Sequence, residues 1–246
     1  MTEDSILWGL AHKRVKWQLD VVTGKRRPIQ NYYLAEEKGY KHPPQQNLRM
    51  LEEQMSEIAS WWKELNGWWF SGAPSISLQC GYDRTHTNLD IGVMRNPSLI
   101  NKMTEQAEKR GYYWFERKAS WKLLPGSDTK QELLEPINPH QLVYDLRPNR
   151  NPILLQIRDD QIMVGNSPVN HLHIHMYERR EEGYYSLEDA LLFPKETMIT
   201  TSMQLSLGNT IRVIKPLHML HKKQTLIQAG NKKTKHLLDI TKIQKT

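Results

Sequence analysis

Apolar residues along the chain follow two different spacings. Between residues 48 and 65 they recur every three or four positions, and residues 97–110 repeat this pattern. Such spacing is typical of helices with one buried face. Apolar runs and alternating segments predict strands at 68–70, 91–93, 112–115 and 169–177. The stretch 124–151 is rich in proline and asparagine and is expected to be an excursion between strands.

Two polar side chains stand at the start of the strand predicted at 91–93. Asn88 and Asp90 are two residues apart, so on a strand they project from the same face. Two oxygen-bearing side chains held in this way form half of a site for a hard cation such as Mg²⁺ bound to nucleotide phosphates. A strand end with a turn asparagine and a capping aspartate gives the same triplet, so the motif alone leaves both readings open.

A turn of small residues lies upstream of these polar side chains. Ser71 and Gly72 follow the strand predicted at 68–70, and a helix is predicted to begin in residues 75–79. A glycine-containing turn at the start of a helix exposes backbone N–H groups to a phosphate. The turn is therefore a candidate site for a phosphate group.

From this point the chain resembles the nucleotidyltransferase superfamily that includes DNA polymerase β, and most closely its aminoglycoside and lincosamide nucleotidyltransferase branch. That branch has a Gly-Gly or Gly-Ser turn, a short helix and then Arg-x-His-x-Asp-x-Asp before a strand. The positions that correspond here are Ser71, Gly72, Arg84, His86, Asn88 and Asp90. Asn88 replaces the first acid of the motif, so the acidic triad is degenerate.

The resemblance extends over roughly residues 55–245 and implies the fold. Residues 208–216 look like the family's late strand, and 217–226 and 233–240 look like its C-terminal helices, with His236 in place of an acid. We therefore expect an α+β fold with a nucleotidyltransferase-like mixed β-sheet flanked by helices. Residues 1–45 are expected to be an N-terminal extension, and residues 46–246 the nucleotidyltransferase-like domain.

The family's third acid should lie on a later strand, but the candidate strand carries histidines instead. The family's Asp-x-His pattern aligns with His173 and His175, so His173 stands in for the acid. Imidazole suits Mg²⁺ poorly and suits Mn²⁺ or Zn²⁺ better. An active enzyme and a member that binds a nucleotide without transferring it both stay open.

The resemblance implies transfer of a nucleotidyl group from an NTP, taken to be ATP, to a hydroxyl of an unidentified acceptor, either a small molecule or RNA. The expected cofactor is a divalent metal, Mg²⁺ or Mn²⁺. The catalytic and metal-binding residues are then Asp90, Asn88 and His173. The nucleotide-binding residues are Ser71, Gly72, Arg84 and His86.

The histidine-bearing strand also supports an alternative function. His171, His173 and His175 alternate with apolar residues, as in the His-φ-His-φ-His-φ-φ signature of histidine triad hydrolases and transferases. That resemblance implies His173 as a nucleophile on a nucleotide α-phosphate, with no need for metal. Alternating histidines on a half-exposed strand without a catalytic role are a further possibility.

Composition limits the remaining choices. The net charge of +7 attracts polyanions, so a non-catalytic nucleotide- or RNA-binding protein is another alternative. The single cysteine, Cys80, excludes an intramolecular disulfide and a cysteine-rich metal site. With a mean hydropathy of −0.68, no segment reaches the ~20 apolar residues of a membrane span. Without an apolar signal core near the N-terminus, the expected location is the cytoplasm.

Overall fold

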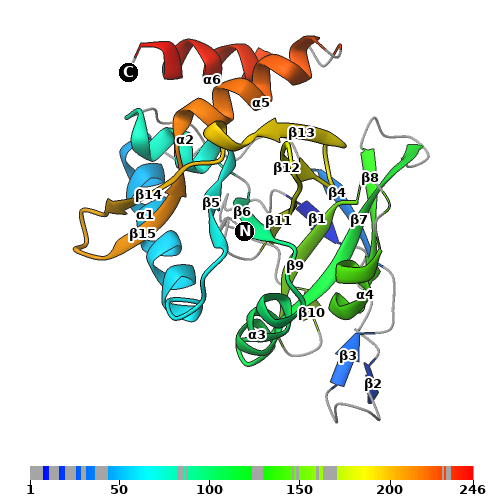
Figure 1. Cartoon of the computed structure of the whole chain (residues 1–246). Coiled ribbons are helices and arrows are strands. Elements are labelled where there is room, and N and C mark those ends of the chain that lie inside the picture. Colours follow the sequence, from blue (N-terminus) through cyan, green and yellow to red (C-terminus); the bar gives the residue numbers. More distant parts are fainter. Residues whose placement is uncertain are drawn as a thin grey trace.

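The structure of the 246-residue chain is a computed structural model (Figure 1). It describes residues 8–10, 17–19, 26–28, 32–36, 44–81, 86, 88–123, 130–145, 147, 150–158, 161–162, 171–228, 230 and 234–245. Side chains are described from residue 48 onward, apart from those at 82–85, 87, 118–133, 146, 148–149, 158–171, 229, 231–236 and 246.

The helices in the described part of the chain are α1 Pro44–Trp61, α2 Gly72–Gln79, α3 Pro97–Glu108, α4 Pro139–Tyr144, the 3-10 turn η2 Lys195–Thr197, α5 Pro216–Gln228 and α6 Thr234–Gln244. Four of them begin at a proline, whose fixed φ suits the first helical position and whose missing N–H would be unpaired there in any case. Asn96 caps α3 by accepting a hydrogen bond from the Leu99 amide.

Strands account for much of the rest. They are β1 Trp8–Leu10, β2 Trp17–Leu19, β3 Arg26–Pro28, β4 Tyr32–Glu36, β5 Trp68–Ser71, β6 Leu89–Met94, β7 Tyr112–Leu123, β8 Lys130–Pro136, β9 Pro152–Arg158, β10 Gln161–Ile162, β11 His171–Arg179, β12 Gly183–Ser186, β13 Leu191–Pro194, β14 Thr200–Gln204 and β15 Thr210–Ile214.

Most of these strands form one 13-stranded sheet, with the order β1-β4-β8-β7-β9-β11-β6-β5-β15-β14 along its main path. The β11–β6 and β15–β5 pairs are parallel and the other neighbours are antiparallel, so the sheet is mixed. This confirms the predicted α+β class. Strands β1 and β4, from the region predicted as an extension, join the sheet through β8.

Side chains alternate between the two faces of the central strands, as strand geometry requires. Trp68 and Phe70 of β5 belong to the larger hydrophobic core, together with α1 and α3, whereas Trp69 belongs to a smaller core with α2 and α5. In β11, Leu172 and Ile174 also face the larger core. The intervening residues of β11 therefore face α2 and α5, and the candidate site lies on that side.

Most predicted elements are present with shifted ends. The helix predicted at 48–65 is α1, and the one predicted at 97–110 is α3. The stretch 124–151 differs from the expected excursion, because it contains β8, paired with both β7 and β4, and the helix α4. Of its prolines, the two in the described residues lie at element boundaries, where Pro136 ends β8 and Pro139 begins α4.

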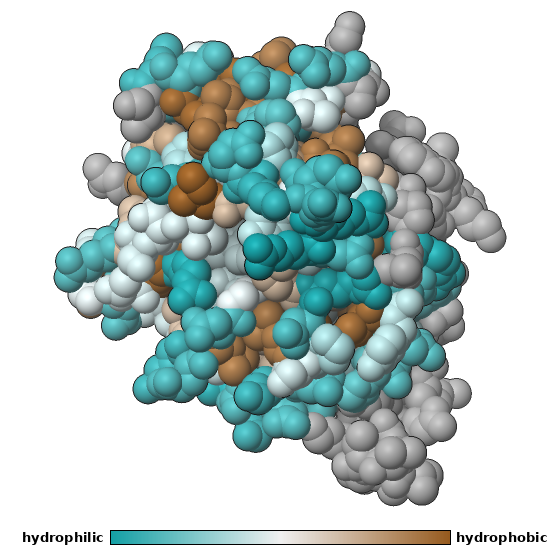
Figure 2. All heavy atoms as spheres, viewed as in Figure 1, coloured by the Kyte–Doolittle hydropathy of each residue, from teal (hydrophilic) through white to brown (hydrophobic). Residues whose placement is uncertain are grey.

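The surface in the view of Figure 2 is largely hydrophilic, and hydrophobic patches gather near the top, where Figure 1 shows α5 and α6. Leu217, Leu237 and Leu238 of these two helices are about half-exposed. Among the helices that the structure describes, none is both long and apolar enough to cross a lipid bilayer.

Candidate functional site

Strand pairing brings three of the predicted site residues together at the centre of the sheet. The parallel register of β6 and β11 sets His173 beside Asp90, and the antiparallel register of β5 and β6 sets Ser71 on the other side of Asp90. Three segments that are far apart in the sequence therefore meet at one carboxylate. Ser71, Asp90 and His173 are therefore neighbours across three paired strands.

Gly72 allows the turn after β5 to approach Asp90 closely. Its φ of +65° lies in the left-handed region, and a Cβ atom there would lie 1.9 Å from Asp90 Oδ2. A side chain at position 72 therefore conflicts with both the backbone and the carboxylate. Gly72 is the first residue of α2, and the side chain of Ser71 makes no capping hydrogen bond to it. The start of α2 thus faces the site with its amides uncapped by Ser71.

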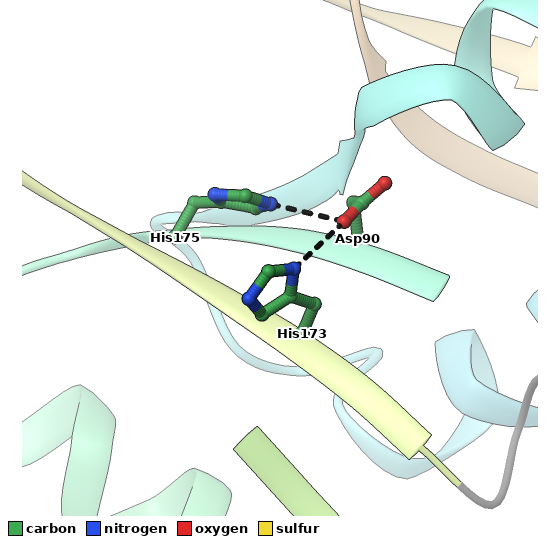
Figure 3. Close-up of side chains that lie close together, drawn as sticks. All are labelled: Asp90, His173 and His175. Atoms are coloured by element: carbon green, nitrogen blue, oxygen red, sulfur yellow. Dashed lines mark hydrogen bonds and ion pairs between the residues drawn. The ribbon is translucent and has the colours of Figure 1, made fainter. Parts of the chain in front are cut away.

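Two histidines from β11 point at the same oxygen of Asp90, as Figure 3 shows. His175 Nε2 lies 3.0 Å and His173 Nδ1 lies 3.3 Å from Asp90 Oδ1. The three side chains each offer one ligand atom, and these atoms lie within 4.8 Å of one another. Asn88 Nδ2 donates a hydrogen bond to the same oxygen at 3.0 Å. This convergence of nitrogen and oxygen donors suits a divalent cation.

The other nitrogen of each imidazole also has a partner. His175 Nδ1 contacts Glu188 Oε2, and His173 Nε2 contacts Asn151 Oδ1 and lies 3.7 Å from Glu188 Oε1. Glu188 comes from the turn between β12 and β13, and Asn151 immediately precedes β9. We call Asp90, His173, His175 and Glu188 the histidine cluster.

The histidine cluster forms a tightly coupled charge network. Burial favours the neutral form of Asp90, but hydrogen bonds from His173 and His175 outweigh it and hold the pKa of Asp90 well below its usual value. Burial likewise lowers the pKa of His175, yet attraction to Glu188 and a hydrogen bond to Asp90 raise it to about 9. The pKa of Glu188 is lowered against its burial, chiefly by attraction to His175.

A second set of buried polar groups lies beside the histidine cluster, where α5 packs against β11 and the turn after β12. Lys222 Nζ lies 2.6 Å from Asp189 Oδ2, and the hydroxyl of Tyr177 lies 3.4 Å from His218 Nε2. Burial opposes the charge on Lys222, but attraction to Tyr177 and Asp189 raises its pKa above the ordinary value. Burial raises the pKa of Tyr177 to about 12.

His218 lies beside Lys222, and its surroundings disfavour a positive charge, whereas those of Lys222 favour one. It is fully buried, and burial together with repulsion from Lys222, His221 and His175 lowers its pKa to about 3. Its Nδ1 atom has no hydrogen-bond partner among the described residues. Tyr177 is its polar neighbour through Nε2. His218 is therefore neutral at physiological pH.

The two remaining residues predicted to bind the nucleotide, Arg84 and His86, are not seen at the histidine cluster in the described part of the chain. His86 is 6% exposed, and its Nε2 lies 2.9 Å from the hydroxyl of Ser77 on α2. This contact ties the segment before β6 to α2. Arg84 lies outside the described residues, and so does the side chain of His171. The proposed roles of Arg84 and His86 in nucleotide binding stay predictions.

Sequence reasoning left two members of the histidine cluster out of the predicted metal site. His175 could have been included, because it lies two residues from His173 on the same face of a strand. Glu188 carries no such signal, since its position depends on the fold of a turn outside β11. Glu178, another nearby acid, pairs instead with Arg95 at 2.6 Å.

Comparisons with known proteins add little to this geometry. No protein-family model and no curated protein matches the sequence. A similar solved structure is the crystal structure of an antigenic nucleotidyltransferase-like protein from Paracoccidioides brasiliensis. It is 14% identical, with a TM-score of 0.42 over 79% of this chain and 75% of that chain. A similarity this low assigns neither a family nor an activity, so function has to be inferred from the residues of the site.

Proposed function

We propose that the protein transfers a nucleotidyl group from an NTP, with ATP as the first candidate, to a hydroxyl group of an acceptor. The observation that supports this proposal is the close approach of the Gly72 turn to Asp90, where a Cβ would lie 1.9 Å from the carboxylate. The approach sets the start of a helix, which attracts phosphates, beside a carboxylate that can hold their counter-ion.

The roles of the residues follow from their positions. Ser71 and Gly72 at the start of α2 receive the triphosphate through backbone N–H groups. Asp90, with His173 and His175, would hold a divalent cation beside the phosphates. Asn88 donates to Asp90 Oδ1, which orients the carboxylate, and its own carbonyl oxygen is the additional ligand predicted from the sequence.

A cation held by these residues would neutralise charge at the phosphates and polarise the reacting oxygen. The acceptor oxygen forms a bond to the α-phosphorus, the bond from that phosphorus to the pyrophosphate oxygen breaks, and the hydroxyl proton passes to solvent. Two imidazoles and one carboxylate fit a single cation, because they carry too little negative charge for the pair of Mg²⁺ ions that three carboxylates can hold.

Two glycines provide a matched test of this proposal. Gly72 and Gly81 both have positive φ, +65° and +57°, but a Cβ at Gly81 would meet nothing within 4 Å. Alanine at either position costs about 1–2 kcal/mol in backbone strain, and only Gly72→Ala also displaces Asp90. Calorimetric titration with ATP, with and without Mn²⁺, compares both variants with the wild type and with Asp90→Ala. Pyrophosphate release is followed in parallel.

The wild type and Gly81→Ala are expected to bind ATP in a Mn²⁺-dependent manner, Gly72→Ala at least tenfold more weakly, and Asp90→Ala without metal dependence. ATP binding that ignores both Mn²⁺ and Asp90→Ala would overturn the proposal. If nucleotide hydrolysis then proceeds without metal and disappears in His173→Ala, the histidine triad function replaces it. If ATP does not bind at all, the proposed transfer is wrong.

A further inference from the structure

We infer that Glu188 and Asn151 preset the two histidines for a transition-metal ion, such as Mn²⁺, Fe²⁺, Co²⁺ or Zn²⁺, in preference to Mg²⁺. Glu188 is a positioning residue in this assignment, and the ligands are Asp90, His173 and His175. The inference rests on the metal site of the proposed function but requires neither nucleotide binding nor transfer.

The contacts divide the imidazole nitrogens into an inner and an outer set. The inner nitrogens, His175 Nε2 and His173 Nδ1, face Asp90 Oδ1 at 3.0 and 3.3 Å. The outer nitrogens face Glu188 and Asn151, which accept hydrogen bonds from them. In this structure the inner nitrogens donate to Asp90. When a metal ion replaces an inner proton, the outer N–H keeps its oxygen acceptor and the inner lone pair points at the ion, so both rings are oriented as ligands.

The turn that carries Glu188 is fixed independently of the histidines. Ala190 has a φ of +54°, the one positive value among the described residues other than glycine. The next acid, Asp189, accepts a hydrogen bond from Ser186 at 2.8 Å and pairs with Lys222 at 2.6 Å. Strain of this kind persists only where surrounding contacts hold it. The turn thus directs one acid at α5 and the other at the histidine cluster.

The donor set determines the class of ion. Imidazole nitrogen binds Zn²⁺, Fe²⁺ and similar ions well, whereas Mg²⁺ requires oxygen ligands and an octahedral shell. Asp90 is the one carboxylate of the inner set, and its side chain is 15% exposed. A water molecule or an oxygen atom of a nucleotide could reach the ion from that exposed side as a further ligand. The site therefore distinguishes transition-metal ions from Mg²⁺ by the type of ligand atom each ion prefers, since the ions carry the same charge.

Calorimetric titration of the full-length, metal-free protein with CoCl₂ and with MgCl₂, in the absence of nucleotide, tests this inference. The variants are Glu188→Ala and Glu188→Gln. The control is Glu182→Ala, which removes the same charge from an exposed position in the turn before β12. The optical absorption of bound Co²⁺ reports nitrogen ligation directly, and circular dichroism reports folding.

We expect one Co²⁺ ion per chain, bound at least tenfold more tightly than Mg²⁺. Glu188→Ala should weaken Co²⁺ binding about 10–100-fold, the usual range for outer partners of metal ligands, and alter the absorption. Glu188→Gln still offers an acceptor oxygen and should recover most of the affinity. Equal affinity for the two ions, or no difference between Glu188→Ala and Glu182→Ala, would overturn the inference.

The two proposals fail in different ways. Tight Co²⁺ binding with no binding of ATP would keep the metal site and remove the nucleotidyltransferase function. Mg²⁺-dependent ATP binding without preference for Co²⁺ would keep that function and remove the inference about Glu188. If Glu188→Ala does not fold, Glu188→Gln and the wild-type preference for Co²⁺ over Mg²⁺ still decide the result.

Discussion

Two groups of charged side chains border one narrow pocket, and they differ in how their carboxylates are neutralised. The histidine cluster contributes Glu188 to its wall. The other group, the arginine cluster, consists of Glu116, Asp145, Arg147 and Arg150, of which Asp145 and Arg150 line the pocket.

The comparison shows which buried charges are available for function. In the arginine cluster, Arg150 Nε lies 2.7 Å from Glu116 Oε1 and its Nη1 atom contacts Asp145. Hydrogen bonds from Arg147 hold the pKa of Asp145 below its usual value. A guanidinium keeps its proton in proteins and offers no lone pair, whereas an imidazole can exchange its proton for a metal ion. The arginine cluster is therefore suited to stabilising the fold, and the histidine cluster is suited to binding a metal ion.

Removing the cation of the arginine cluster should have the largest effect on stability. Arg150→Met leaves Glu116 without its cation and Asp145 with Arg147 alone, and the free energy of unfolding should fall by about 2–4 kcal/mol. Urea denaturation measures the loss. Co²⁺ affinity should stay within a few-fold of the wild type, and a loss of stability below about 0.5 kcal/mol would contradict the structural role.

The corresponding change in the histidine cluster should act on binding instead. His175→Gln removes one inner nitrogen, and Co²⁺ affinity should fall by at least about a hundredfold, equivalent to about 2.7 kcal/mol. Calorimetric titration measures the affinity. The free energy of unfolding of the metal-free variant should change by less than that of Arg150→Met; the reverse order would mean that the two clusters do not differ as inferred.

Metal removal should separate the clusters in a single thermal experiment. At a free Co²⁺ concentration ten times its dissociation constant, binding stabilises the folded wild type by about 1.4 kcal/mol. For a chain of this size the melting temperature should rise by about 3–6 °C, and EDTA should reverse the rise. Arg150→Met should show the same shift from a lower starting temperature, and His175→Gln should show none.

The smallest effect concerns His218, a buried histidine outside both clusters. It is faced by Tyr177 from β11, by His221 and Lys222 from α5, and more distantly by His175. Its pKa of about 3 lies below the ordinary 6.5, so between these values the unfolded chain binds a proton that the folded protein does not. Stability contributed by neutral His218 is therefore present above pH 6.5 and lost as the pH falls toward 3.

His218→Gln removes this titration and keeps a polar group near Tyr177. Between pH 7.5 and pH 5.5 the wild type should lose about 1 kcal/mol more free energy of unfolding than the variant. Urea denaturation at both pH values measures the difference. Identical pH dependence of the two proteins would show that His218 has an ordinary pKa.

Local patterns predicted the elements better than their ends. The helix predicted at 97–110 is α3, because its apolar spacing, Asn96 cap and proline start all agree. In contrast, the stretch 124–151 was expected to be an excursion, although residues 130–136 form β8. That strand is stabilised by pairing with β7, its neighbour along the chain, and with β4, which is distant in sequence, and neither pairing leaves a local periodicity.

The sequence by itself determined the mixed composition of helices and strands, the Ser71–Gly72 turn, and the proximity of Asn88 and Asp90 at the start of β6. These features depend on short-range geometry, namely the two-residue period of a strand and the conformational freedom of glycine. Only the tertiary structure decided that both β11 histidines share Asp90 Oδ1. It also decided that Glu188 supplies an acid beside them, because strand register and the path of a turn depend on long-range pairing.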